Sequence, residues 1–236
     1  MYRHRLLWIA LIVVVSACAQ FDGRYPGGFT MPRSRGDDSA TLTAALREAL
    51  EQGTARAVEV LGRNNGYFAN PQVRIPMPEN LRRVEQTLRR LGLNKYADDF
   101  VLSMNRAAER AAPEAAAVFL SAIRNMSVQD AAGIIRGPDN AATEYFRRHT
   151  ERELFQKFRP IVSRSTERVG VTRQYKQLVQ RLGPAIPTDA RKLDLDSYVT
   201  QEALDGLFIM VAREEKRIRT DPAARTTQLL RQVFGK

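Results

Sequence analysis

Cysteine and histidine are almost absent from this chain of 236 residues, which contains one cysteine and two histidines. A single cysteine cannot form a disulfide within the chain. His4 lies close to the N-terminus, so only His149 is available in the body of the chain, and a histidine-based zinc site lacks ligands. A Ser-His-Asp triad would depend on His149, where the neighbouring Arg147 and Arg148 disfavour the imidazolium that the mechanism forms.

The sequence also lacks the motifs of the commonest cofactor-binding and hydrolytic sites. It contains no P-loop, no dinucleotide-binding fingerprint and no nucleophile elbow. Carboxylates are therefore the only route to catalysis. The neighbouring acids 98–99 and 214–215 point to different helix faces within each pair, and Asp194 and Asp196 precede a helix that they are expected to cap. We expect no cofactor and no metal site.

No apolar run is long enough to cross a bilayer, which takes about 20 residues. The longest, 6–15, follows a basic start and ends in Ser16-Ala17 before Cys18. This pattern is typical of a secretory signal with a lipoprotein-type processing site, so residues 1–17 are predicted to be a signal peptide. The alternative is an N-terminal anchor that is not cleaved.

Cys18 is expected to carry the lipid, because several acyl chains on one residue give stable anchoring. Ala19 follows the cysteine where inner-membrane lipoproteins of enteric bacteria have Asp, and this similarity favours the outer membrane. Loss of Arg3 and Arg5 with the signal peptide lowers the formal net charge from +11 to +9. Outside the cytoplasm a basic surface meets lipid phosphates or cell-wall carboxylates, so the expected partner is the membrane, with an envelope protein or lipid as a further ligand and no nucleic acid.

Residues 18–38 are rich in Gly, Pro and Arg and are predicted to form a flexible tether. Residues 39–236 are predicted to form one all-α domain of about eight to ten helices. Apolar spacing and helix-terminating residues place these helices at about 39–61, 78–91, 94–111, 113–126, 127–136, 140–160, 161–182 and 200–220, with a closing helix around 229–234.

Several details of these helices are specific predictions. Asp38 or Ser39 should cap the first helix. Leu91 should share the buried face of the second helix with the preceding leucines, and Pro160 should kink or break the sixth. The helix at 200–220 carries the strongest apolar stripe and is expected to be central.

Residues 68–78 break the helical pattern. Val73, Ile75 and Met77 alternate with polar residues, which is the period of extended chain. Pro71 and Pro76 prevent regular strand pairing. The favoured interpretation is an extended connector whose apolar side fills the bundle, and the alternative is an edge that binds a partner.

Three blocks of sequence, 70–78, 103–109 and 198–208, resemble those of a bacterial family known as domain of unknown function 4197. The resemblance covers about residues 39–236. It departs from the usual pattern at Met77, where members usually have Leu, and at Glu202, where they often have Lys. The second change reverses the charge, so no ion pair is carried over from the family to Glu202. The resemblance implies an exported all-helical protein and supplies no catalytic residues.

Two groups of polar side chains are candidate sites. The first is a partly buried polar cluster of Arg74, Asn105, Arg106, Glu109 and Asp205. We expect these residues to form structural ion pairs, and the alternative is a binding site. The second is a group of four arginines, Arg82, Arg83, Arg89 and Arg90. It is a candidate anion-binding patch for lipid head groups, and the alternative is a solvated helix face.

The sequence therefore predicts an outer-membrane lipoprotein that faces the periplasm and binds or scaffolds an envelope lipid or protein, in an apolar groove near the helix at 200–220. The alternative is a carboxylate-dependent hydrolase that acts on cell-envelope material. A binding protein should have an open groove, whereas an enzyme should bring two carboxylates together in a cleft with raised pKa values. The oligomeric state stays open.

Overall fold

The structure is a computed structural model that describes residues 35–168, 193–225, 227 and 231. Seven α-helices lie in these ranges: α1 (Arg35–Gly62), α2 (Arg82–Arg90), α3 (Asn94–Ala111), α4 (Ala115–Arg124), α5 (Val128–Arg136), α6 (Ala141–Arg168) and α9 (Leu195–Thr220). Three short 3-10 helices accompany them: η1 (Glu79–Leu81), η2 (Ala112–Glu114) and η4 (Pro222–Ala224). The described ranges contain no β-strand, which confirms the all-α prediction.

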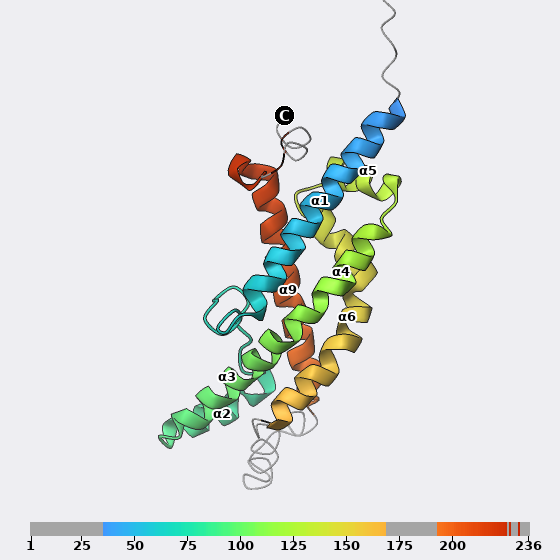
Figure 1. Cartoon of the computed structure of the whole chain (residues 1–236). Coiled ribbons are helices and arrows are strands. Elements are labelled where there is room, and N and C mark those ends of the chain that lie inside the picture. The colour runs from blue at the N-terminus through green and yellow to red at the C-terminus, as the bar shows by residue number, and fades with distance from the viewer. Residues whose placement is uncertain (1–34, 169–192, 226, 228–230, 232–236) are drawn as a thin grey trace, which may run out of the picture. The chain divides into compact units, whose positions relative to one another are not determined.

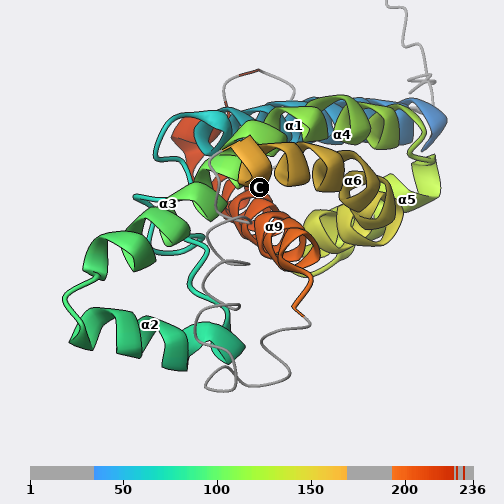
Figure 2. The same ribbon diagram turned by 90° about the horizontal axis from the view of Figure 1, so that it is seen from below.

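The helices form two layers with a projecting hairpin. In Figure 2, α1 and α4 lie side by side above α6 and α9, and α5 connects the layers at one end. Helix α9 packs against α6, α1 and α3, as expected for the central helix. The hairpin of α2 and α3 extends at the end of the bundle opposite to the start of α1 (Figure 1).

Aromatic rings from three helices meet in the middle of the bundle. The ring centroid of Phe119 in α4 lies 5.1 Å from that of Phe146 in α6 and 6.3 Å from that of Phe208 in α9. All three side chains are buried. Tilted and edge-on ring pairs of this kind add to the stabilisation that burial itself provides. The two layers are therefore joined by one continuous apolar core.

Helix α1 begins earlier than predicted. It starts at Arg35, so Asp38 and Ser39 lie inside the helix and the predicted cap at these residues is wrong. The helix thus takes in the last four residues of the segment that the sequence assigned to the tether. Cys18 and the rest of the predicted leader and tether, up to residue 34, lie outside the described residues.

Helix α6 continues through Pro160, so of the predicted kink or break the break is wrong. Proline removes one backbone hydrogen bond and crowds the preceding turn. The side chains of Leu154, Phe158 and Val162 recur every four residues on one face, and all three are fully buried on both sides of the proline. Their packing holds the helix together across Pro160. The predicted helical segment beyond residue 168 and the closing helix around 229–234 lie outside the described residues.

Residues 63–78 link α1 to η1 and are called the connector. Val73 and Ile75 are buried in the core, whereas Gln72 and Arg74 are exposed, so the predicted alternation of the extended segment is confirmed. Tyr67 in the connector is fully buried, and its hydroxyl donates to the carbonyl of Ala203 in α9 at 2.7 Å. The connector therefore fills the bundle, as the favoured interpretation expected.

None of the described helices combines the length and the apolar character that a membrane crossing requires.

Candidate functional site

The side chains of α3 hold the connector in place. Asn105 is fully buried, and its amide donates to the carbonyl of Ile75 at 2.9 Å and accepts the N–H of Ile75 at 2.9 Å. Glu109 accepts the backbone N–H groups of Tyr67 and Phe68, both at 3.1 Å. Two buried polar side chains thus satisfy backbone groups that have no partner within regular secondary structure. Burial, and then the charge of Glu109, raise the pKa of the Tyr67 phenol.

Arg106 extends this arrangement to the surface. One nitrogen lies 2.5 Å from the second oxygen of Glu109, and the other donates to the side chain of Asn65 at 2.8 Å. Asn65 has a backbone φ of 69°, in the left-handed region that asparagine tolerates better than most residues. Asn105, Arg106 and Glu109 therefore form the structural part of the predicted polar cluster.

Asp205 does not belong to this cluster. Its carboxylate pairs with Arg147 of α6 at 2.9 Å and accepts from Gln201 one turn earlier in α9. The next residue, Gly206, faces the connector instead, since a Cβ added there would lie 2.8 Å from the ring of Tyr67. Adjacent positions on a helix point in different directions, so α9 presents Gly206 to the connector and Asp205 to α6.

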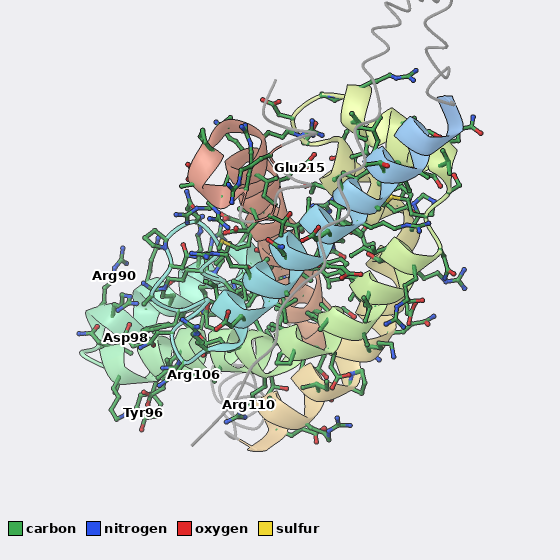
Figure 3. All side chains as sticks on the ribbon, turned by 45° about the horizontal axis from the view of Figure 1, so that its top comes forward. Arg90, Tyr96, Asp98, Arg106, Arg110 and Glu215 are labelled. Carbon is green, nitrogen blue, oxygen red and sulfur yellow. The ribbon has the colours of Figure 1, made fainter. Side chains whose placement is uncertain are left out.

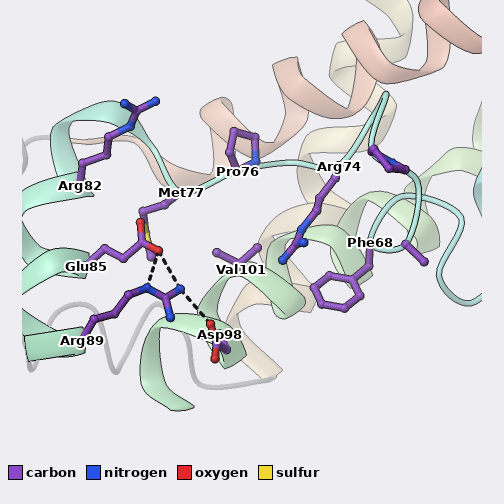
Figure 4. A pocket seen from close by; sticks show the side chains of 11 residues that line it. Phe68, Arg74, Pro76, Met77, Arg82, Glu85, Arg89, Asp98 and Val101 are labelled. Carbon is purple, nitrogen blue, oxygen red and sulfur yellow. Dashed lines mark hydrogen bonds and ion pairs between the residues drawn. The ribbon is translucent and has the colours of Figure 1, made fainter. Parts of the chain in front are cut away.

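A groove of about 630 Å³ lies between the connector, α2 and α3 (Figure 4). We call it the arginine groove. Its lining combines apolar residues with three arginines and two acids: Phe68, Ala69, Pro71, Arg74, Pro76, Met77, Arg82, Glu85, Arg89, Asp98 and Val101. Its size is typical of a site for a small organic ligand.

Arg74 is the cation in this groove that has no carboxylate partner among the described residues. Its guanidinium carbon lies 4.6 Å from the ring centroid of Phe68, which favours a stacked cation by about 0.5–1 kcal/mol at an exposed site. The backbone of Phe68 is held by Glu109. Arg74 is thus positioned by a chain of contacts that begins in the core, and its N–H groups remain available to a ligand.

Arg89 binds both acids of the groove. It donates to Glu85 at 2.8 and 3.0 Å and to Asp98 at 2.9 Å. The hydrogen bonds to Glu85 and Asp98 raise the pKa of Arg89. Arg82 pairs with Glu79 at 2.9 Å. Arg82 and Arg89 are therefore both paired with acids, and Arg74 is the arginine of the groove that is placed to bind an anionic group of a ligand.

The four arginines of the predicted anion patch therefore divide into two kinds. Arg82 and Arg89 line the groove and are paired with carboxylates, whereas Arg83 and Arg90 are exposed and have no such partner among the described residues. The single patch that the sequence suggested is split, because acids from η1, α2 and α3 reach only one side of α2.

A small hollow lies beside α9. Among the described residues it is lined by Leu46, Ile134 and Ile218, and its volume of about 20 Å³ is close to that of a single water. This hollow is too small for a lipid chain. The larger arginine groove has no α9 residue in its lining.

Two further titratable groups lie at the start of α9. Partial burial, and then the charge of Asp205, raise the pKa of Glu202. Partial burial, and then Glu202, raise the pKa of Tyr198 to about 12. The Tyr198 hydroxyl donates to the carbonyl of Pro76 at 3.2 Å, so the phenol helps to hold the connector. No ion pair involves Glu202 within the described ranges.

His149 occupies a structural position. Its Nδ1 lies 2.8 Å from the carbonyl of Tyr145, and the two rings are stacked with centroids 4.2 Å apart. Within the ranges that the structure describes, no group of three or more histidine, cysteine, aspartate and glutamate side chains is arranged to hold a metal ion.

Sequence reasoning missed the pairing of Phe68 with Arg74 and the role of Glu215. Glu215 is buried and accepts the N–H groups of Ala142 and Thr143 in the first turn of α6, at 3.0 and 2.9 Å. The only local signal was its spacing of four residues from Arg219, which pairs with it at 2.9 Å. Nothing in the sequence identifies a partner more than seventy residues away.

Comparison with known proteins gives one match. A family model described as "Protein of unknown function (DUF4197)" matches residues 37–235. No curated protein and no solved structure is significantly similar to the chain.

Proposed function

The chain belongs to the family described as Protein of unknown function (DUF4197), and since that description states no activity, we propose a function from the chain's own residues. It is an outer-membrane lipoprotein that faces the periplasm, anchored through Cys18, and its helical domain binds an anionic group of an envelope lipid or protein in the arginine groove. The observation that carries the binding role is Arg74, which is held over Phe68 in this groove with no carboxylate partner among the described residues.

The chemistry of the groove supports an anionic ligand with an apolar part. A guanidinium presents two parallel N–H groups to a carboxylate or a phosphate. Phe68, Met77 and Val101 offer apolar surface beside it. Because Arg89 is bound to Glu85 and Asp98, the ligand's charge pairs with Arg74.

The alternative, a carboxylate-dependent hydrolase, has less support. The acids in the groove, Glu85 and Asp98, both hydrogen-bond the same guanidinium. Glu202, whose pKa is raised, is not among the groove's lining residues. A general acid must lie within hydrogen-bond reach of the reacting group. The arrangement therefore favours binding.

The anchor is tested by labelling cells with radioactive palmitate. We expect the wild-type protein to be labelled and to fractionate with the outer membrane, and we expect Cys18→Ser to lose the label completely, because no other thiol exists in the chain to accept the lipid. A wild-type protein without label, or a labelled Cys18→Ser variant, would contradict the anchor.

The groove is tested by native mass spectrometry of the full protein extracted from envelopes. Wild type is expected to retain a ligand of defined mass. Arg74→Gln is expected to lower its occupancy about tenfold or more, since a hydrogen bond to a charged group contributes about 1.5–3 kcal/mol.

Arg136→Gln is the matched control, because Arg136 is exposed at the end of α5 and lies outside the groove. This variant should retain the ligand. If wild type carries no ligand, or if Arg74→Gln retains it as well as the control does, the groove is not the binding site. Either result leaves the anchor unaffected, because the anchor is tested separately.

A further inference from the structure

The turn between α2 and α3 concentrates exposed apolar side chains. Leu91, Leu93 and Tyr96 are 65%, 39% and 55% exposed, and we call these three residues the hairpin tip. Three other large apolar residues are exposed in the described ranges. They lie singly on three different helices and are Leu42, Val128 and Ile209. Scattered exposed apolar residues are ordinary, whereas a group of them marks a surface that contacts something apolar.

The hairpin tip has a defined backbone conformation. The N–H of Leu93 donates to the carbonyl of Leu88 at 2.8 Å, and that of Gly92 donates to the carbonyl of Arg89 at 3.1 Å. These two bonds, with Gly92 at a φ of 74°, form a Schellman motif that ends α2. The turn directs Leu91 outward, so the prediction that Leu91 shares the buried face of α2 is wrong.

Helix α2, which leads into this turn, carries two arginines that have no carboxylate partner in the described ranges. Arg83 and Arg90 are seven residues apart and therefore lie on one face of α2. The other two cations close to the turn are paired, Arg89 with Glu85 and Asp98, and Lys95 with Asp99 at 2.7 Å. Figure 3 shows that Arg90 and Tyr96 both lie at this end of the molecule, on different sides of the hairpin.

We propose that the hairpin tip is a membrane-contact site that inserts into the interfacial region of a bilayer containing anionic lipids. Leu91, Leu93 and Tyr96 enter the boundary between head groups and acyl chains, where leucine and tyrosine side chains are favoured. Arg83 and Arg90 pair with lipid phosphates. The combination of an exposed apolar group with unpaired cations selects an anionic lipid surface over a purely apolar partner.

This contact is separate from the proposed anchor and from the arginine groove. The start of α1, where the anchored end of the chain enters the domain, lies at the opposite end of the bundle from the hairpin tip (Figure 1). None of the three tip residues lines the groove. The hairpin tip would therefore give the domain a second membrane attachment, which limits its rotation about the tether.

The test is vesicle flotation with the polypeptide 19–236, which carries no acyl chain and contains the whole compact unit Ser34–Lys236. We expect it to float with vesicles of phosphatidylcholine and phosphatidylglycerol and to remain unbound with phosphatidylcholine alone. Arg83→Gln with Arg90→Gln should weaken binding to the mixed vesicles by about 25-fold, at about fivefold per cation. Leu91→Ser with Tyr96→Ser should weaken it at least as much.

Val128→Ser with Ile209→Ser is the matched control, since it removes exposed apolar side chains elsewhere and should float like wild type. All of these substitutions are on the surface, and unchanged far-UV circular dichroism will show that each variant is folded. The proposal is overturned if wild type does not float, or if the tip variants float as well as the control. It is also overturned if the tip variants change only the mass measured by light scattering, which would show that the tip joins two copies of the chain.

Discussion

Replacing Glu215 with leucine is expected to lower the free energy of unfolding by about 3–5 kcal/mol, measured by urea denaturation followed with circular dichroism. The side chain of Glu215 is 5% exposed and accepts hydrogen bonds from two backbone N–H groups of α6, from the hydroxyl of Thr143 and from Arg219. Leucine satisfies none of these donors. The loss is a large share of the stability of an ordinary domain, which is about 5–15 kcal/mol.

The position of Glu215 explains why this effect should be large. Its carboxylate lies at the N-terminus of α6, where the helix dipole favours negative charge. One turn later Arg219 donates to the carbonyl of Ile134 near the end of α5, at 2.9 Å. A single turn of α9, labelled at Glu215 in Figure 3, thus fixes both the end of α5 and the start of α6.

Two further variants separate this role from a general effect of removing an acid. Glu215→Gln keeps the shape and one acceptor but loses the charge, and should cost about 1–3 kcal/mol. Glu153→Gln, on the exposed side of α6, removes a weak contact to Lys157 at 3.9 Å and should change stability by less than about 0.5 kcal/mol. If Glu215→Leu were as stable as Glu153→Gln, the capping role of Glu215 would be wrong.

Replacing Asn105 with alanine is expected to lower the free energy of unfolding by about 2–4 kcal/mol, because it leaves the buried N–H and carbonyl of Ile75 without partners. A third bond, from the Asn105 amide to the carbonyl of Val101 at 2.8 Å, is lost as well. Hydrogen exchange provides a local measurement, since the amide of Ile75 should exchange faster by a larger factor than amides in α9 do.

Asn125→Ala is the control for this variant. Asn125 follows α4, is exposed and has an ordinary helical backbone conformation, so its replacement should change stability by less than about 0.5 kcal/mol. Asn105→Asp keeps an acceptor for the N–H of Ile75 but places a carboxylate against the carbonyls of Ile75 and Val101 in a fully buried position, so it should destabilise the protein at least as much as Asn105→Ala. Unchanged exchange at Ile75 in Asn105→Ala would show that other contacts hold the connector.

The connector links this prediction to the proposed function. It supplies Phe68, Arg74 and Met77 to the arginine groove. Loosening it through Asn105 should therefore weaken ligand retention even though Asn105 does not line the groove. Arg74→Gln should have the opposite pattern, with lost ligand and nearly unchanged stability, because Arg74 is exposed and contacts only the ring of Phe68 among the described aromatic residues.

Local patterns in the sequence were enough to find most of the elements. Apolar residues at three- and four-residue spacing predicted where the described helices lie, except that α6 continues through Pro160 and that α1 and α9 begin four and five residues earlier than predicted. Ser127 caps α5 together with Asp130, and the connector shows the alternation that its sequence predicted. These features depend on neighbours close in sequence, so local pattern is sufficient to find them.

Which polar residues contact one another depends on how the helices pack in the tertiary structure. Asn105 finds Ile75, Glu215 finds the start of α6, and Asp205 turns away from the cluster assigned to it toward Arg147. Packing also explains two further differences from the sequence prediction. Buried leucine, phenylalanine and valine side chains stabilise α6 on both sides of Pro160, and Leu91 points outward. The reason is that helix packing sets which faces come together, and residues far apart in sequence carry no local signal of the partner that packing gives them.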